Sequence, residues 1–220
     1  MSEPAIRAVD LTRSYENGLV EAVTGVSVHV ASGEFVAIMG PSGSGKSTFL
    51  NCVGTLDWPT SGQVFLDGEE VINGPHVHRL RRRKIGFVFQ FHNLIPNLTL
   101  AENLQIPLSG AAMTRKEKRE RALYLLDRVG LGPRARHRAN RVSGGERQRA
   151  AIARALVNNP SILLADEPTG NLDSANGRVA LDLLLELRRD AGMTMVVVTH
   201  NPEVARSADR VFEFRDGRIV

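Results

Sequence analysis

A glycine-rich loop between a short apolar run and a helical segment constrains the fold of this sequence more than any other feature. Residues 35–39 (FVAIM) predict a buried strand, and residues 40–48 (GPSGSGKST) match the pattern G-x-x-x-x-G-K-[ST]. Backbone N–H groups of such a loop point at phosphate oxygens, and the following helix adds the positive end of its dipole. The alternative is an ordinary glycine-rich turn, which the flanking strand and helix disfavour. The pattern predicts a phosphate-binding loop in an α/β domain.

The residue types in this loop suit a nucleotide. Lys46 places a point charge beside the β- and γ-phosphates, and the Ser47 hydroxyl is a hard oxygen ligand for Mg²⁺. We therefore expect ATP and Mg²⁺ to bind here. The predicted nucleotide-binding residues of the loop are Gly40, Pro41, Ser42, Gly43, Ser44, Gly45, Lys46, Ser47 and Thr48.

Other short apolar runs predict further strands toward both ends of the chain. They are 20–30, 63–67, 85–89, 162–165 and 193–199, and residues 210–220 have the pattern of a closing hairpin. Continuous apolar strands that alternate with helices favour a parallel sheet covered on both faces.

The middle of the chain has a different pattern. Between residues 91 and 159 no run is convincing as a strand, whereas 114–129 and 143–157 have the apolar spacing of amphipathic helices. This stretch is much longer than a simple crossover between two strands needs. We predict one domain over residues 1–220, with an α/β core formed by 1–90 and 160–220 and a helical subdomain inserted at 91–159.

Two acids follow one of the predicted strands. Asp166 and Glu167 end the run ILLADE, at the sheet rim where α/β folds bind ligands. Because neighbouring strand residues point in opposite directions, the two acids are expected to take different roles. Asp166 would hold Mg²⁺ through water, and Glu167 would polarise the water that attacks the γ-phosphate. The alternative is a pair of solvated acids before Pro168.

Two more polar residues end predicted strands. His200 follows the strand at 193–199 and can donate to a γ-phosphate oxygen while holding Glu167 in place. Gln90 follows IGFVF, where the helical segment begins, and its amide oxygen can bind Mg²⁺ or the attacking water. A structural histidine and a simple polar strand end are the alternatives for these two positions.

Composition excludes several classes of protein. The formal net charge is only +4, and the single cysteine, Cys52, permits no intrachain disulfide and suits a small core position. The first 18 residues lack the apolar region of a secretory signal. No segment approaches the roughly 18 to 20 continuous apolar residues of a spanning helix. We expect a soluble chain whose membrane role, if any, requires a partner.

The motifs together resemble those of the ABC ATPase family. Residues 142–149 (VSGGERQR) are similar to the family's signature, usually Leu-Ser-Gly-Gly-Gln. Val142 replaces the usual Leu and Glu146 replaces the usual Gln, and ATP hydrolysis is still expected with both replacements. The resemblance covers essentially the whole chain and implies a P-loop NTPase (RecA-like) parallel core with an antiparallel β subdomain. It also implies a head-to-tail homodimer on ATP binding. In that dimer, each nucleotide lies between one chain's loop and the partner's Ser143, Gly144, Gly145 and Glu146, with Asp173 crossing the interface and Tyr15 stacking on the base.

The signature and Tyr15 also have plain structural interpretations. Ser143 and Glu146 form the S-x-x-E pattern of a capping box, so this segment can simply start a helix. Two glycines at a helix start cost stability, yet they leave backbone amides open to an anion. Tyr15 can be an ordinary tyrosine, and stacking alone would also accept GTP.

The sequences of residues 89–104 and of residues 168–173 (PTGNLD) are similar to those of one subgroup of the family. This subgroup contains the lipoprotein-releasing, macrolide-efflux and cell-division ATPases. The resemblance implies an integral membrane permease subunit on a separate chain, which docks beside Gln90 and places this protein at the cytoplasmic face of the membrane. The alternative is a mechanical regulator of a membrane complex that transports nothing. A third hypothesis, a soluble ABC ATPase that acts on DNA or ribosomes, has less support. The basic run at 79–84 is better explained as a solvated helix face than as a nucleic-acid or lipid site. We expect no nucleic-acid partner.

Overall fold

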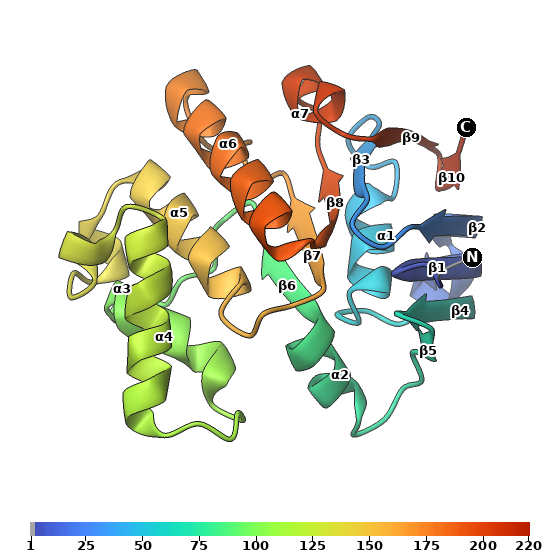
Figure 1. Cartoon of the computed structure of the whole chain (residues 1–220). Coiled ribbons are helices and arrows are strands. Elements are labelled where there is room, and N and C mark those ends of the chain that lie inside the picture. Colours follow the sequence, from blue (N-terminus) through green and yellow to red (C-terminus); the bar gives the residue numbers. More distant parts are fainter. Residues whose placement is uncertain (1–2) are drawn as a thin grey trace.

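The computed structural model describes residues 3–220, and within them two β-sheets lie on either side of a helix (Figure 1). The described residues of the larger sheet form six strands in the order β10-β9-β3-β8-β7-β6, and those of the smaller form four in the order β2-β1-β4-β5. The larger sheet contains β3 (Phe35–Met39), β6 (Ile85–Val88), β7 (Ile162–Asp166), β8 (Thr194–Val198), β9 (Arg210–Arg215) and β10 (Arg218–Ile219). The smaller contains β1 (Ile6–Tyr15), β2 (Val20–Val30), β4 (Ser61–Leu66) and β5 (Glu69–Glu70).

The larger sheet is parallel apart from its closing hairpin. Strand β3 lies between β8 and β9 and runs parallel to both, and β6, β7 and β8 continue in the same direction. Its apolar runs alternate between two cores. Val36 and Ile38 face the core shared with α1 (Lys46–Val53) and the smaller sheet, whereas Phe35 faces the core shared with the other helices. The predicted parallel sheet with two covered faces is confirmed.

Strand β1 was not predicted from the sequence. It pairs antiparallel with both β2 and β4, and its register shifts several times along its length. These irregularities interrupt the alternation of buried and exposed side chains, so its sequence lacks a clean period of two. The strand is therefore stabilised by backbone pairing with a neighbour on each edge. The residue pattern of β1 alone does not indicate this pairing.

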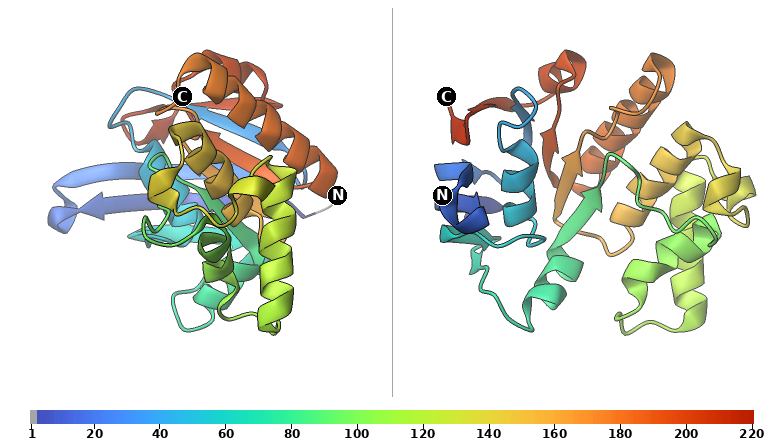
Figure 2. Two further views of the ribbon diagram at one scale, coloured as in Figure 1. Left: turned by 90° about the vertical axis from the view of Figure 1, so that its left-hand side faces the viewer. Right: turned by 180° about the vertical axis from the view of Figure 1, so that it is seen from behind.

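Helices α3 to α7 contribute to the core on the second face of the larger sheet, whereas Leu80 of α2 belongs to the first core. In Figure 2, α3, α4 and α5 gather on the side of the sheet far from β1, β2 and β4. The predicted helices at 114–129 and 143–157 correspond to α4 and α5, each with a capping box at its start. Helix α6 was not predicted. The helices are α2 (Val77–Lys84), α3 (Leu100–Gln105), α4 (Arg115–Arg128), α5 (Gly144–Ala155), α6 (Ser174–Ala191) and α7 (Pro202–Arg206), with 3-10 turns η1 (Glu16–Gly18), η2 (Ile106–Leu108), η3 (Gly132–Arg134) and η4 (Ala139–Arg141).

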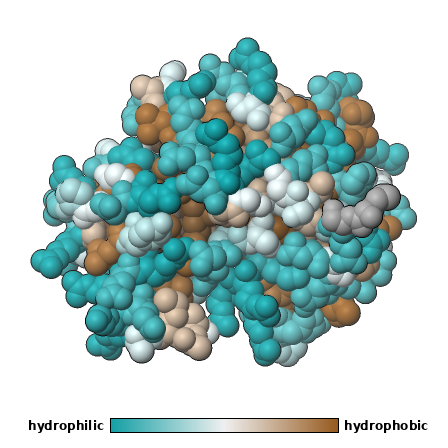
Figure 3. Space-filling model, viewed as in Figure 1, coloured by the Kyte–Doolittle hydropathy of each residue, from teal (hydrophilic) through white to brown (hydrophobic). Residues whose placement is uncertain are grey.

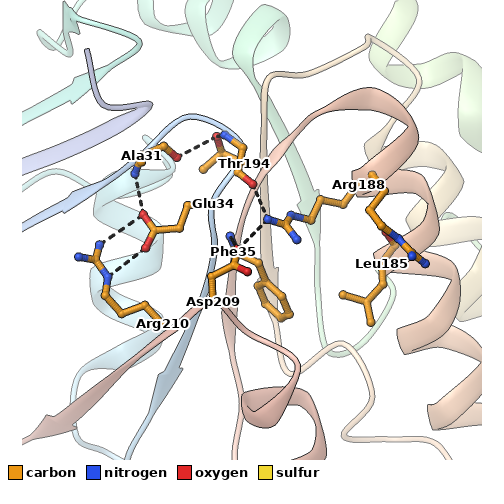
Figure 4. A network of polar contacts seen from close by, with 10 residues as sticks. Ala31, Glu34, Phe35, Leu185, Arg188, Thr194, Asp209 and Arg210 are labelled. Atoms are coloured by element: carbon orange, nitrogen blue, oxygen red, sulfur yellow. Dashed lines mark hydrogen bonds and ion pairs between the residues drawn. The ribbon is translucent and has the colours of Figure 1, made fainter. Parts of the chain in front are cut away.

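A polar network anchors the start of β3 (Figure 4). The backbone N–H of Phe35 donates to the Asp209 carboxylate at 2.7 Å, and Arg188 from α6 pairs with the same carboxylate at 2.8 Å. Glu34 pairs with Arg210 of β9 at 3.0 Å. These contacts tie β3 to β9 and α6 at the end opposite the glycine-rich loop, so the loop extends from a fixed strand.

One face of the molecule is largely polar, and the single cysteine, Cys52, is buried. Polar side chains cover most of the face in Figure 3, with apolar residues in separate patches. No helix within residues 3–220 is both long enough and apolar enough to cross a membrane. Cys52 is buried in the core, and burial raises the pKa of its thiol to about 12, so it is an inert core residue.

The basic run at 79–84 lies on α2 and contributes to the fold. Arg81 donates to the Thr55 carbonyl oxygen at 2.7 Å, and Lys84 pairs with Glu69 at 3.1 Å. Val77 and Leu80 bury the opposite face of the helix. Part of the run is therefore used for packing rather than solvated throughout.

Candidate nucleotide-binding site

The glycine-rich loop between β3 and α1 approaches neighbouring backbone so closely that side chains are excluded. A Cβ atom on Gly45 would lie 2.0 Å from the Ala22 carbonyl oxygen, and one on Gly40 would lie 2.1 Å from that of Phe214. Both glycines have positive φ, 100° and 147° respectively. The loop is thus seated against β2 and β9, which gives its backbone one curved path.

This loop forms one wall of a cavity of about 410 Å³. Every predicted nucleotide-binding residue of the loop lines it except Pro41, whose carbonyl oxygen accepts a hydrogen bond from Lys46 at 2.6 Å. The Lys46 ammonium also donates to the Gly40 carbonyl at 2.8 Å. Burial lowers the pKa of Lys46, and the nearby Glu167 and Asp166 carboxylates oppose this shift. The cation is therefore held across the loop, where phosphate oxygens would replace its carbonyl partners.

Two hard oxygen donors meet at the cavity wall. The Ser47 hydroxyl, at the start of α1, donates to the Asp166 carboxylate at the end of β7 at 3.1 Å. Burial raises the pKa of Asp166, and the Ser47 hydrogen bond opposes this effect. Within residues 3–220 no cluster of three or more His, Cys, Asp and Glu side chains could hold a metal. A hydroxyl with one carboxylate still fits Mg²⁺, which usually keeps several waters and phosphate oxygens as ligands.

The direction of Glu167 differs from the sequence-based expectation. Asp166 and Glu167 were expected to point in opposite directions, yet both line the same cavity. The reason is the backbone, because β7 ends at Asp166 and Glu167 has a φ of +46°, in the left-handed region. This turn places Glu167 beside Asp166 in the cavity lining, with its carboxylate against His200.

His200 and Gln90 complete the cavity. The His200 Nδ1 lies 2.9 Å from the Glu167 Oε1, and the His200 backbone N–H donates to Oε2 at 3.3 Å. The Gln90 side chain lines the cavity, and its backbone carbonyl accepts a hydrogen bond from Asn171 at 2.9 Å. The ends of β6, β7 and β8 thus bring four of the predicted site residues to this cavity, namely Gln90, Asp166, Glu167 and His200.

Tyr15 lies outside the lining of this cavity, at the end of β1. Its phenol donates to the Asp57 carboxylate at 2.5 Å, and the Arg13 guanidinium lies over its ring at 4.4 Å. Asp57 also pairs with Arg13 at 2.9 Å. Burial raises the pKa of Asp57, but the hydrogen bond from Tyr15 and the Arg13 charge bring it below the usual range. The Arg13 guanidinium therefore covers one face of the Tyr15 ring, and the Asp57 hydrogen bond fixes the ring's orientation.

Arg13 and Asp57 were missed in the sequence. Arg13 is two residues from Tyr15 on β1, but this strand was not predicted and its register shifts between Arg13 and Ser14, so the spacing gave no signal. Asp57 follows α1 and reaches Tyr15 only through the fold, so no local signal indicates it.

The signature segment lies away from this cavity. Ser143 caps α5 by accepting a hydrogen bond from the Glu146 backbone N–H at 3.2 Å, and the Glu146 carboxylate accepts from the Ser143 N–H at 2.8 Å. A Cβ on Gly145 would lie 2.5 Å from the Asn176 side chain. Asp173 caps α6 by accepting from the Asn176 N–H at 2.9 Å. The cavity lining includes none of the signature residues 143–146.

Known proteins are similar to this chain in sequence. The ABC transporter family model matches residues 23–170. The lipoprotein-releasing system ATP-binding protein LolD of Syntrophus aciditrophicus is 48% identical to this chain. The alignment spans 98% of this chain and 97% of LolD. The macrolide export ATP-binding/permease protein MacB of Brucella melitensis is 48% identical over 99% of this chain, which spans only 34% of MacB.

A solved structure has the same fold. The dimeric, post-hydrolysis state of the ATP-binding cassette MJ0796 of Methanocaldococcus jannaschii, bound to ADP and Pi, aligns with a TM-score of 0.89. It is 45% identical to this chain and covers 97% of it, with 96% of MJ0796 aligned. The predicted P-loop NTPase fold, ATPase activity and subgroup are confirmed. The chain belongs to the ABC transporter family, as an ATP-binding and ATP-hydrolysing cassette of the type found in LolD and MacB.

Proposed function

We propose that this chain is the energy-coupling subunit of a membrane transporter, in which two copies close on ATP and thereby move a permease on a separate chain. One observation carries the proposal. At the start of α5, Ser143 is exposed, Gly144 is half-buried and Gly145 is buried, yet none of the three lines the chain's own phosphate cavity. A second copy, placed head to tail, would supply them to the open side of that cavity. The dimeric MJ0796 cassette supports this arrangement.

The residues around the cavity suit hydrolysis of the terminal phosphate. Glu167 acts as the general base that polarises the attacking water. His200, 2.9 Å from the Glu167 carboxylate, orients it and donates to the γ-phosphate. Gln90 positions the water or the metal from the end of β6. Lys46 and the amides of the loop bind the phosphate charge, so the protein contributes mainly position and electrostatics.

The hydroxyl of Ser47 and the carboxylate of Asp166 would hold Mg²⁺, with the Gln90 amide oxygen as a further ligand. The metal, when bound, neutralises phosphate charge that develops during transfer. Asp166 accepts the Ser47 hydrogen bond at 3.1 Å, so both donors already face one point.

Tyr15 stacks on the base. Its ring is held by the Asp57 hydrogen bond and by Arg13 on one face, so a base would stack on the opposite face. Stacking is tolerant of the base, and ATP preference would come from other contacts.

The permease docks on the helical subdomain 91–159, beside Gln90. Phe91, Ile95 and Ile106 are exposed there, with Phe91 73% accessible. These side chains suit a short apolar segment of the membrane partner, which would place this chain at the cytoplasmic face of the membrane. LolD and MacB are named for different cargoes, so the proposal concerns energy coupling and not the cargo.

Two variants test the proposal on the purified chain. Glu167→Gln removes the base while keeping the side-chain shape, so ATP still binds but turnover falls at least about 100-fold. Light scattering after size exclusion is expected to show an ATP-dependent dimer for Glu167→Gln. Adding Ser143→Arg to Glu167→Gln is expected to abolish that dimer while preserving ATP binding to the monomer. Turnover by Glu167→Gln near the parent rate, or a normal dimer in the double variant, would refute the proposed roles.

A further inference from the structure

Helix α5 makes a buried contact with the turn that carries the catalytic carboxylate. Gln148 on this helix is only 1% exposed, and its side-chain amide donates to the Pro168 carbonyl oxygen at 2.6 Å. Pro168 follows Glu167 directly and is itself buried. A buried hydrogen bond of this kind is costly to lose, because the carbonyl would remain without water as a substitute.

The turn at Glu167 is one that needs external support. A non-glycine residue at a φ of +46° is strained, and such strain persists where surrounding contacts over-determine it. Two of those contacts are backbone hydrogen bonds. The Glu167 N–H donates to the Val198 carbonyl at 2.9 Å, and the Glu167 carbonyl accepts from the Gly170 N–H at 3.1 Å. Gln148 supplies a further contact, from a different part of the chain.

The position of Gln148 on α5 links two places. Ser143 caps the start of this helix, five residues before Gln148, which is a rise of about 7 Å along a rigid helix. A displacement of the Ser143 end of α5 would therefore also move Gln148. Through the hydrogen bond of Gln148, it would move the Pro168 peptide group beside Glu167.

We propose that Gln148 is a positioning residue that couples the signature helix to the Glu167 carboxylate of the same chain. The inference rests on the proposed function, since it assumes that Ser143–Gly145 meets a partner's nucleotide. When that contact forms, any displacement of α5 passes through the existing Gln148–Pro168 hydrogen bond to the turn that holds the general base. Each chain would thus align its own base as it completes the partner's site.

A purely structural role for Gln148 predicts a loss of stability with no specific loss of turnover. Gln148→Met distinguishes the two roles, because methionine keeps the length and volume of glutamine but has no N–H donor. The matched control is Ile152→Val, at a fully buried position on the same helix, which removes one methylene and leaves the Pro168 contact intact.

The experiment measures steady-state ATPase activity, ATP affinity of the monomer and thermal stability for both variants. A displacement of the base by about 1 Å lowers a rate by roughly 100-fold. Gln148→Met is therefore expected to lose about 10- to 100-fold in kcat, with ATP affinity within about two-fold of the parent. Ile152→Val, at a similar loss of Tm, is expected to retain kcat within about two-fold.

A second measurement uses the Glu167→Gln background. With the base already removed, Gln148→Met is expected to lower the residual turnover no further, because residues that act together are not additive. Equal kcat losses in Gln148→Met and Ile152→Val, or a full additional loss in the Glu167→Gln background, would overturn the coupling role. Failure of the proposed function is recognised separately, because Glu167→Gln alone would then turn over normally.

Discussion

Replacing Gly45 by alanine tests whether the phosphate loop depends on close backbone approach. The added Cβ would lie 2.0 Å from the Ala22 carbonyl oxygen, whereas ordinary contacts begin at 3.4 Å. Either the loop or β2 must therefore move by about 1.4 Å. Gly43 provides a matched control in the same loop, because it also has a positive φ, 79°, but a Cβ there meets nothing within 4 Å.

The two substitutions share one cost and differ in another. A left-handed backbone costs an alanine about 1–2 kcal/mol, and the lost flexibility of the unfolded chain returns about 0.4–1 kcal/mol. Gly43→Ala should therefore lower the free energy of unfolding by about 1 kcal/mol. Gly45→Ala adds overpacking of about 1–3 kcal/mol, for a total near 3 kcal/mol. In a domain of this size the expected falls in Tm are about 3 °C and about 9 °C.

Nucleotide binding should separate the two variants as well. Movement of the Gly45 backbone withdraws amide donors from the phosphates, and each lost hydrogen bond to a charged group is worth about 1.5–3 kcal/mol. Thermal unfolding with and without Mg-ATP, together with calorimetric titration, measures both effects. We expect at least a ten-fold loss of ATP affinity for Gly45→Ala relative to Gly43→Ala. Identical Tm values and ATP affinities for the two variants would refute the close approach of Gly45 to β2.

Three further substitutions have measurable outcomes. Lys46→Ala removes the loop cation and should weaken ATP binding about 10- to 100-fold, so an unchanged affinity in titration would contradict the phosphate-loop assignment. Asp57→Ala frees the Tyr15 ring and should lower ATP affinity several-fold without affecting inorganic tripolyphosphate; an equal loss for both ligands would rule out a role at the base. Glu146→Gln should cost about 0.5 kcal/mol at pH 7, because the negative charge at the start of α5 is removed. The hydrogen bond from the Ser143 backbone N–H lowers the pKa of Glu146, although burial opposes this shift. The difference in unfolding free energy between the parent and Glu146→Gln is therefore fully present above about pH 4.3, the unfolded pKa, and vanishes as pH falls through the lower native pKa. A difference in urea-unfolding free energy that persists at pH 2 would contradict it.

Local sequence determined the phosphate loop and most of the strands that carry the site. The run from 35 to 48 contains the strand, the glycines and the lysine in order, and the structure confirms a strand, a curved loop and a helix there. The ends of β7 and β8 were likewise readable, because short apolar runs followed by polar residues indicate buried strands that stop at a ligand edge. These features are local, so neighbouring residues specify them.

Contacts between distant segments decided the rest. Strand β1 is supported by pairing with β2 and β4, and its bulges erase the alternation that would have revealed it. Asp57 reaches Tyr15 across 42 residues, and Gln148 reaches Pro168 across 20, so neither pair has a spacing signal. The left-handed turn at Glu167 is strained in isolation and exists because the surrounding fold supports it. Sequence thus determined which chemical groups are available, and tertiary packing decided where the carboxylate points and which residues hold it.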